Sequence, residues 1–549
     1  LKAAPSSKDF TGVSSTIMQI DLAPTLGLLL GVGIPSKSAG RVIPSVIPDF
    51  QYSDALRINA RQMQRFLDKR GIVVETALPE HATIEEYEHF IDLAQKSLAQ
   101  SVDTNDSKME YVALTGSLIL LAIPVLYFSK SSLDLCSDSG TKHQICRFGI
   151  EFWFLLAGMI LHPIFLASSS IIENEHAYWF YFTSSWLFLC LVKKVALSVH
   201  LNIVEKASNN NQMAKLLGVM ILLRLERCRL QVINFALLAG LPEPDVVSQG
   251  TAILVVPDIF GSSISAGTAC CLFTVFTATG IFVTRKQSNR VVTSLSFFFI
   301  TLGGFMLLSL KGINDPEVVM FDISAILRAR IVYVCVLALI ILSVLSRDSI
   351  YFVVSMSMLF LLLKRSSLTF LVVIVSLKLF LMTEYFISET NLIPSLGVLV
   401  LWALGQCAFF AFGNSHAIAT VDVSGAYTGL TEYNMTICGF LCGIITFSGP
   451  VLATAHIVRF IEVKIWRANS LAVTGKLRVV RIREVNLAFW ILQSVTSFRI
   501  WAISAILVAM QSHLFIWTVF APKWMYETLF TVAVSAASQL LFTVAAGNQ

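Results

Sequence analysis

The sequence predicts a mainly α-helical, polytopic membrane protein with about 12–13 transmembrane helices and a short water-soluble part at its N-terminus. Composition is the first reason. Hydrophobic residues make up 55% of the 549 positions and charged residues only 14%, whereas soluble domains carry roughly 25% charged residues. The second reason is that apolar runs follow one another from residue 111 onward, with lengths near the ~20 residues that cross a bilayer. Lipid is therefore expected to be the main solvent of this chain.

The soluble part covers residues 1 to about 108 and begins with an apolar helix. Asp21 is placed to be its N-cap, and Gly31 or Gly33 is placed to end it. Because this helix is apolar nearly all round, we expect it to be buried in a larger globular domain. Two amphipathic helices are expected next, at 54–70 and 83–100. The apolar stripe of the first consists of Leu56, Met63, Phe66 and Leu67.

The apolar runs are the candidate membrane helices. They lie at roughly 111–129, 148–168, 177–193, 211–224, 266–284, 291–310, 327–346, 349–363, 366–383, 394–412, 436–457, 487–509 and 524–545. Basic residues gather in alternate connections, above all in 459–483, and the opposite connections are acidic or neutral. By the positive-inside rule the soluble N-terminal part is then lumenal or external. This alternation of basic and acidic connections requires the short run 211–224 to cross the membrane.

Several functions are excluded by the same composition. The net charge is only +5 and no run is basic enough to neutralise many phosphates, so we expect no nucleic-acid partner. The ten cysteines are scattered without the spacing of a zinc site or a disulfide framework. No Walker, GxSxG or HExxH motif is present. Four ionisable residues inside apolar runs could face a cavity: Glu151, His162, Lys378 and His456.

The connection SSSIIENEHAYWFYF (168–182) is the first candidate for chemistry. Glu173, Glu175 and His176 cluster there between two membrane helices. An acidic group beside a histidine at such a junction can hold a cationic or sugar head group; the alternative is an ordinary hydrated loop end. The aromatic residues Trp179 and Tyr181 are expected to be interfacial anchors.

The connection GNSHAIATVDVSGAYTGLTEYN (413–434) is the second candidate. It is rich in Gly, Ser, Thr and Asn and has one aspartate, Asp422. It is either a plain connector or a structured segment that binds a head group. A third segment, 511–527, contains Pro522, which interrupts the last two helices. Its expected interfacial anchors are Trp517, Lys523, Trp524 and Tyr526.

Several sequence blocks resemble a known family. QIDLAPTLGLLLGVGIPSKSAGRVIP (19–44) is similar to the C-terminal end of an alkaline-phosphatase-superfamily domain, in which D-x-x-P-T-L is followed by G-x-x-I-P. Together with SSSIIENEHAYWF, GNSHAIATVDVSGAYTGL and HLFIWTVFAPKWMYE, it resembles the GPI ethanolamine phosphate transferases of the endoplasmic reticulum. FSGPVLATAHIV (447–458) favours the member that acts on the second mannose, with the third-mannose member as the alternative.

The resemblance implies a division of the chain. Residues 1–50 would be the C-terminal remnant of an α/β alkaline-phosphatase-like lumenal domain, 51–108 a lumenal helical linker, and 109–549 the multi-pass transmembrane domain. Such enzymes use a threonine nucleophile and zinc held by Asp and His, all placed before the D-x-x-P-T-L helix. The twenty residues before Asp21 contain no histidine, and the chain starts with Leu1. The resemblance thus implies an N-terminally truncated chain with no catalytic or zinc-binding residue of its own.

The resemblance also implies the substrates and partners. Phosphoethanolamine would pass from phosphatidylethanolamine to a mannose of the GPI glycolipid intermediate, in the endoplasmic reticulum membrane, with a small membrane protein as a possible stabilising subunit. The predicted substrate-binding residues are Glu173, Glu175, His176, Asn414, Asp422 and Tyr427. Two other functions remain open: a lipid transporter or flippase, and a non-catalytic membrane subunit.

Overall fold

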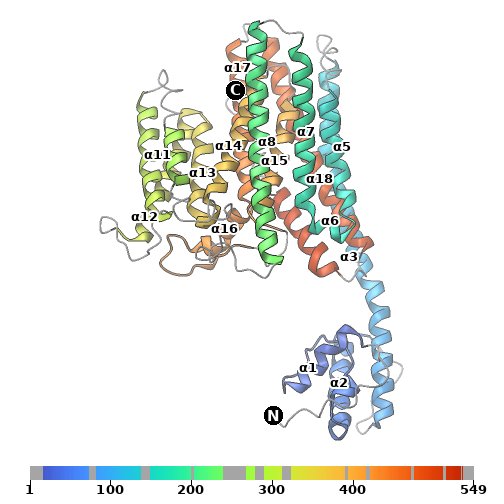
Figure 1. Ribbon diagram of the computed structural model, residues 1–549. Helices are drawn as coiled ribbons and strands as arrows, with labels where there is room; N and C mark the ends of the chain where they lie inside the picture. Colours follow the sequence, from blue (N-terminus) through green and yellow to red (C-terminus); the bar gives the residue numbers. More distant parts are fainter. Residues whose placement is uncertain are drawn as a thin grey trace. The chain divides into compact units, whose positions relative to one another are not determined.

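In the computed structural model, every regular element of the described residues is a helix. The described residues are 17–72, 82–137, 149–199, 203–238, 268–278, 290–311, 323–389, 394–415, 421–471, 475–510, 515–532 and 535. The chain forms two compact units, Leu1–Thr115 and Gly116–Gln549. The predicted mainly α-helical class is confirmed (Figure 1). The assignment of 1–50 and 51–108 to separate pieces stays a prediction.

The elements have the following bounds. Those that begin in the first unit are η1 (Gln19–Asp21), α1 (Leu22–Leu29), η2 (Pro44–Val46), α2 (Asp49–Arg70) and α3 (Ile84–Ser137). Those of the second are α5 (Ile150–Phe165), α6 (Ser169–Glu173), α7 (Glu175–Ser198), α8 (Ile203–Leu238), α11 (Arg290–Lys311), α12 (Ala325–Ser346), α13 (Ile350–Leu363), α14 (Ser366–Ser388), α15 (Pro394–Ala411), η4 (Ser424–Tyr427), α16 (Met435–Thr446), α17 (Ser448–Leu471), α18 (Gly475–Ala509) and the π-helical turn η5 (Ile516–Phe520).

The core of the first unit lies between α2 and the start of α3. The predicted stripe of α2 is confirmed, since Leu56 and Met63 are fully buried and Phe66 and Leu67 nearly so. It packs against an apolar stripe of α3. The buried amide of Asn59 then fixes the segment before α2, because its Nδ2 donates to Gly40 O and its Oδ1 accepts from Val42 N, both at 3.2 Å.

α1 differs from its prediction in two ways. Asp21 occupies the N-cap position but makes no capping bond; its Oδ1 accepts from Arg41 N at 2.7 Å. The helix ends as expected, with Gly31 in the left-handed region at φ +69°. Burial is the larger difference, because the exposed fractions of Leu22, Leu26 and Leu29 are 47%, 51% and 48%. None of the described residues covers this apolar face.

The second unit is a multi-pass helical membrane domain. Six described helices are long and apolar enough to cross a membrane: α7, α11, α12, α14, α15 and the Asn486–Ala509 part of α18. The run predicted at 436–457 is not one helix, because α16 and α17 are bent by 71°; together they give a seventh candidate span. Four shorter apolar helices are Leu114–Tyr127, Ile150–Phe165, Thr268–Ala278 and Ile350–Leu363. The run at 524–545 lies largely outside the described residues, so the total of about 12–13 stays a prediction.

α15 lies at the centre of this unit, and all of its residues are buried. α7, α14, α17 and α18 pack around it (Figure 1). Glycines allow the closest approach, to α17. A Cβ at Gly449 would lie 2.5 Å from the backbone nitrogen of Phe409, and one at Gly405 would lie 2.6 Å from Cβ of Ala453. Small residues at such crossings are the usual way for membrane helices to gain packing contacts.

α8 runs antiparallel to α7 along its length. Near one end, Asn209 Nδ2 donates to Lys194 O at 3.0 Å; near the other, the Arg227 guanidinium lies 3.9 Å from the Tyr181 ring centroid. The predicted crossing of 211–224 falls within α8, which is not among the described helices that are apolar enough to cross a membrane, so this crossing and the orientation that depends on it stay predictions. Ion pairs hold one end of the unit: Lys193 with Glu151, Lys194 with Glu389, and Arg459 with Glu384.

The ionisable residues predicted inside apolar runs all have protein neighbours. Lys378 Nζ donates to Glu226 Oε2 at 2.7 Å, and both side chains are fully buried between α14 and α8. Nδ1 of His456 lies 3.2 Å from the Thr383 hydroxyl. Buried ion pairs at this depth are costly unless both partners are present, so the Glu226–Lys378 pair fixes how α8 and α14 pack.

Candidate functional site: a buried ionic network between α5, α7 and α18

The turn between α5 and α7 brings two polar side chains together. Most of the predicted loop 168–182 is helical: α6 covers Ser169–Glu173 and α7 begins at Glu175. Asn174 joins them and donates from Nδ2 to Ser170 O at 2.9 Å. Because the turn is this short, the last turn of α5, with His162, faces the first turn of α7, with Glu175.

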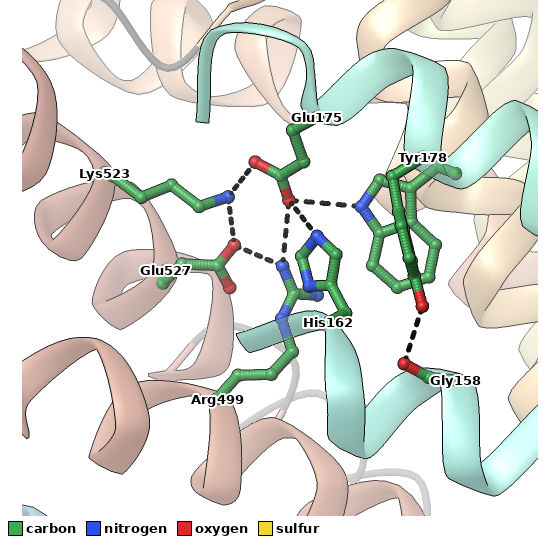
Figure 2. A network of polar contacts seen from close by, with 8 residues as sticks. Gly158, His162, Glu175, Tyr178, Arg499, Lys523 and Glu527 are labelled. Atoms are coloured by element: carbon green, nitrogen blue, oxygen red, sulfur yellow. Dashed lines mark hydrogen bonds and ion pairs between the residues drawn. The ribbon is translucent and has the colours of Figure 1, made fainter. Parts of the chain in front are cut away.

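Glu175 is the centre of the network in Figure 2. Lys523 Nζ donates to its Oε2, and also to Oε1 of Glu527 at 2.8 Å. Arg499 Nη2 donates to Glu527 Oε1 at 2.5 Å and lies 3.5 Å from Glu175 Oε1. The exposed fractions of Glu175 and Lys523 are both 0%. Two carboxylates and two basic side chains are thus enclosed together, in equal number.

Aromatic rings enclose the guanidinium of Arg499. Its Cζ lies 5.3 Å from the ring centroid of Trp179 and 5.0 Å from that of Trp402. The same Trp179 donates from Nε1 to Glu175 Oε1 at 3.1 Å. Cation–π contacts of this kind gain strength away from water. Trp179 therefore contacts groups of both signs: its ring lies near the Arg499 guanidinium, and its indole N–H donates to the Glu175 carboxylate.

His162 lies against the same carboxylate. Its Nε2 is 3.1 Å from Glu175 Oε1, but neither ring nitrogen makes a hydrogen bond of good geometry. Its ring packs on Tyr178 and Trp179 at centroid distances of 4.7 and 4.6 Å. Tyr178 in turn donates to Gly158 O at 2.7 Å, which ties α7 to α5 (Figure 2).

The network joins segments that are far apart in the sequence. Glu175 is 324 residues from Arg499 and 348 from Lys523. Removing one partner from such a group leaves a buried charge uncompensated, which is strongly destabilising. The arrangement therefore locks the α5–α7 turn to α18 and to the helix at 521–532. Both oxygens of Glu175 are occupied by protein groups, so this carboxylate offers no free face to an ammonium group in this structure.

The other two predicted residues of this connection remain accessible. Glu173 is exposed at the end of α6. His176 is half-buried, and its ring lies 6.5 Å from that of Phe410 at the end of α15. The first predicted cluster is therefore split: Glu175 points into the protein, whereas Glu173 and His176 lie at its edge.

The second connection has its own polar contacts. Asn414 is buried and donates from Nδ2 to Phe409 O at 3.0 Å and to Thr446 O at 3.1 Å, so it ties α15 to the end of α16. Asp422 accepts from the backbone N and the hydroxyl of Ser424 and lies 3.3 Å from Arg365. Part of the predicted segment, 416–420, lies outside the described residues.

Tyr427 is 48% exposed and lies at the end of η4, with its ring 6.2 Å from that of Tyr433. The residue after η4 is bound by a side chain of α12, since Tyr333 Oη donates to Thr428 O at 3.1 Å. Burial tends to raise the pKa of Asp422, but the hydrogen bonds from Ser424 and the charge of Arg365 outweigh it and lower the pKa below its usual value. Asp422 is thus a largely buried carboxylate, 16% exposed, whose charged form is stabilised by Ser424 and Arg365.

The two connections are linked through α15. His176 contacts Phe410, and Asn414 follows four residues later. Three interfacial anchors were predicted wrongly: the exposed fraction is 0% for Trp179 and Lys523 and 5% for Tyr526. The anchors Tyr181 and Trp517 are exposed, as expected.

Sequence reasoning missed the roles of Arg499 and Glu527. Arg499 stands alone in the apolar run 487–509, and Lys523 and Glu527 have the i, i+4 spacing of a helical ion pair. These signals mark buried charge. They do not reveal that Arg499 and Lys523 both pair with Glu175, because nothing local connects such distant positions.

The zinc implied by the resemblance has no matching ligands in the described part of the chain, where no three His, Cys, Asp or Glu side chains converge. The cysteines that the structure describes are free thiols. No reaction step is therefore assigned to a metal here.

Comparison with known proteins agrees with this architecture. A family model described as the GPI ethanolamine phosphate transferase membrane region matches residues 132–232 and 265–548. The chain is 24% identical over 534 residues to GPI ethanolamine phosphate transferase 2 of Schizosaccharomyces pombe, covering 96% of this chain and 59% of the relative. It is 23% identical over 572 residues to the protein of the same name from Yarrowia lipolytica, covering 94% and 63%.

A shorter match is to human GPI ethanolamine phosphate transferase 2, catalytic subunit: 30% identity over 139 residues, 25% of this chain and 13% of the human protein. No solved structure matches. The chain spans about three fifths of the length of the fungal relatives, 59% and 63%. Since the family model covers well over half of the chain, this protein belongs to the family defined by the membrane region of the GPI ethanolamine phosphate transferases.

Proposed function

We propose that this chain is the membrane part of an enzyme that transfers phosphoethanolamine from phosphatidylethanolamine to a mannose of the GPI glycolipid. The match of the membrane-region family over 132–232 and 265–548 carries this proposal. The fungal relatives named GPI ethanolamine phosphate transferase 2 align along nearly the whole chain and favour the second mannose over the third.

The N-terminal unit is proposed to end a lumenal catalytic domain of the alkaline-phosphatase type. In that reading the threonine nucleophile and the zinc ligands lie outside this chain, which is inactive alone. The exposed apolar face of α1 supports the reading, because Leu22, Leu26 and Leu29 form the kind of surface that a larger domain buries. Such an enzyme would lie in the endoplasmic reticulum membrane with this unit in the lumen.

The membrane domain is proposed to hold the lipid substrates. Glu173, His176 and Tyr427 are accessible, and Asp422 is a largely buried carboxylate whose Oδ1 is bound by Ser424 and Arg365 close to Tyr427. Glu175 and Asn414 bind only protein groups, so we assign them the task of positioning the two connections rather than touching substrate. The buried network then keeps this end of the domain rigid while lipid and glycan bind.

A complementation experiment tests the proposal. Fungal cells that lack their own GPI ethanolamine phosphate transferase 2 would receive either the 549-residue chain or a chimera. The chimera carries the segment of the S. pombe relative that precedes the matching region, joined ahead of Leu1. Mass spectrometry of GPI glycans would report which mannose carries phosphoethanolamine. We expect the chimera, and not the chain alone, to restore the second-mannose group.

Two results would contradict the proposal. A chimera that is stably inserted in the membrane but adds no phosphoethanolamine would remove the transferase assignment. Modification of the third mannose instead of the second would keep the reaction and overturn the choice of acceptor. A stabilising membrane subunit, if required, would appear as a protein that co-purifies with the active chimera.

A further inference from the structure

α8 carries an arginine whose guanidinium has no acceptor among the described residues. Arg227 is half-buried, and its Cζ lies 3.9 Å from the ring centroid of Tyr181. Its Nε and Nη1 atoms are buried and make no hydrogen bond. Buried nitrogens also occur in Arg41, Arg328, Arg459 and Arg499, but each of these donates to at least one protein oxygen.

The surroundings of Arg227 are those of a membrane interface. Tyr181 is 61% exposed, and Arg224, one helical turn earlier, is exposed too. The charge of Arg227 acts on the ring of His176, which also interacts with the main-chain carbonyl of Glu173. The Arg227 side chain therefore points from α8 toward the first predicted substrate-binding connection. It lies at the end of the domain opposite the Lys194–Glu389 pair.

An apolar face runs along α8 and ends beside Arg224; Arg227, three residues later, lies on the neighbouring side of the helix, against Tyr181 of α7. Leu217, Ile221 and Leu225 follow one another at i, i+4 and i+8, so they share one side of the helix. Their exposed fractions are 44%, 61% and 38%. In a membrane domain such a face meets acyl chains, and Arg224 is three residues after Ile221 on the same side. Basic side chains next to an apolar stripe complement a phospholipid, in which an anionic phosphate is joined to acyl chains.

An unpaired guanidinium in a half-buried, apolar place is unfavourable, because its lost hydration is not replaced. A phosphate group replaces it well: two of its oxygens accept parallel N–H donors of a planar guanidinium. The contact with the Tyr181 ring restrains the guanidinium and so reduces the entropy lost when a ligand binds it.

We propose that Arg227, assisted by Arg224, binds the phosphodiester of a membrane glycerophospholipid whose acyl chain lies along Leu217, Ile221 and Leu225. This deepens the proposed function and rests on it in one respect: the lipid would be one of the two substrates. Both phosphatidylethanolamine and the phosphoinositol end of the GPI glycolipid present this group, so the shared ligand is the phosphodiester and the source is settled by experiment.

Native mass spectrometry of the full 549-residue chain, purified in maltoside micelles, tests the site. Phosphatidylethanolamine and phosphatidylinositol would be titrated separately, and the apparent Kd of the first bound lipid measured. We expect Arg227→Gln to weaken binding of the resident lipid about tenfold, the scale of a lost charge-assisted hydrogen bond. Arg227→Lys keeps the charge but not the planar donors and should fall between wild type and Arg227→Gln.

Two further variants make the test specific. Tyr181→Leu removes the ring and should weaken binding about threefold, because the guanidinium loses the aromatic contact that restrains it. Arg290→Gln is the matched control: Arg290 is an exposed arginine at the start of α11, and its removal should leave the Kd unchanged. A loss with phosphatidylethanolamine alone assigns the donor lipid to the site, and a loss with phosphatidylinositol alone assigns the acceptor type.

The inference is overturned if Arg227→Gln binds both lipids as wild type does, or if Arg290→Gln weakens binding equally. Elution of each variant as a single species with an unchanged thermal midpoint excludes misfolding as the cause of a loss. The readout needs no transfer reaction. If the chimera adds no phosphoethanolamine while Arg227→Gln still loses lipid, the transfer proposal fails and the lipid site stands.

Discussion

The two ends of the membrane domain use the same kinds of charge in different ways. At one end, lysines and arginines pair with carboxylates one by one and stay partly accessible; Lys194 and Glu389 are 13% and 20% exposed. At the other end, Glu175, Glu527, Arg499 and Lys523 share one enclosed network with 0–4% exposure. Solvent and lipid head groups can replace a partner at the first end. Neither can reach the enclosed network at the second end. The network therefore fixes how the α5–α7 turn packs against α18.

The largest effect is expected from breaking the buried network. Lys523→Met leaves two carboxylates with one cation and should destabilise the domain by about 3–5 kcal/mol. The thermal midpoint in detergent, followed by fluorescence-detected size exclusion, measures the loss. Adding Glu175→Gln to the same chain removes the excess negative charge and should recover part of it. A double variant that is as unstable as the sum of the single ones would show that Glu175 and Lys523 are not coupled.

The next largest loss of stability is expected at the close contact between α15 and α17, the two helices that connect the ends of the domain. Gly449→Ala places a methyl group 2.5 Å from the backbone nitrogen of Phe409, so the helices must separate. Overpacking of this kind costs about 1–3 kcal/mol. Gly439→Ala on α16 is the control, since nothing lies within 4 Å of its added Cβ. Equal midpoints for both variants would mean that the α15–α17 approach adjusts without cost.

A smaller effect is expected at the accessible end. Arg459→Gln removes the 2.8 Å pair with Glu384, whose side chain is 29% exposed. Such pairs contribute about 1 kcal/mol or less. The midpoint should therefore fall much less than in Lys523→Met, and added salt should narrow the difference further. A fall in the midpoint as large as that of Lys523→Met would contradict the idea that the accessible ion pairs contribute less stability than the buried network.

The smallest effect is expected at Asp422, whose carboxylate is bound by Ser424 and Arg365. Its pKa lies below the usual 3.8, so its stabilising contribution is present above that value and is lost as pH falls through the lower pKa of the folded state. Cleavage near η4 by an acid-active protease should increase at the acid end of this range. Asp422→Asn should show no such pH dependence beyond that of the protease itself. A wild-type cleavage profile identical to that of the variant would contradict the assignment.

Much of the helical architecture could be predicted because it depends on local patterns. The stripe Leu56–Met63–Phe66–Leu67 and the apolar runs are visible in a short window of sequence, and the structure places helices there. The break between α16 and α17 at Phe447 was not predicted, although Gly449 and Pro450 directly after it are residues that interrupt helices.

The functional end was harder to predict, because its chemistry depends on distant partners. Glu175 was expected to meet a ligand, yet it meets Lys523 and Arg499 from the far end of the chain. Lys523 and Trp179 have the composition of interfacial anchors, and only three-dimensional packing shows that they are enclosed. Arg227 is the opposite case: its importance comes from an acceptor that the described protein does not supply.

The enclosed position of α15 has a consequence for biosynthesis. Two of the helices that cover it, α17 and α18, follow it in the chain, so they leave the ribosome after it. Until then α15 must stand in the bilayer with Gly397 and Gly405 facing acyl chains. Its apolar composition therefore suits it to lipid during insertion. Its glycines allow close helix packing later, when protein replaces the lipid around it. The same 18 residues must suit two solvents in succession.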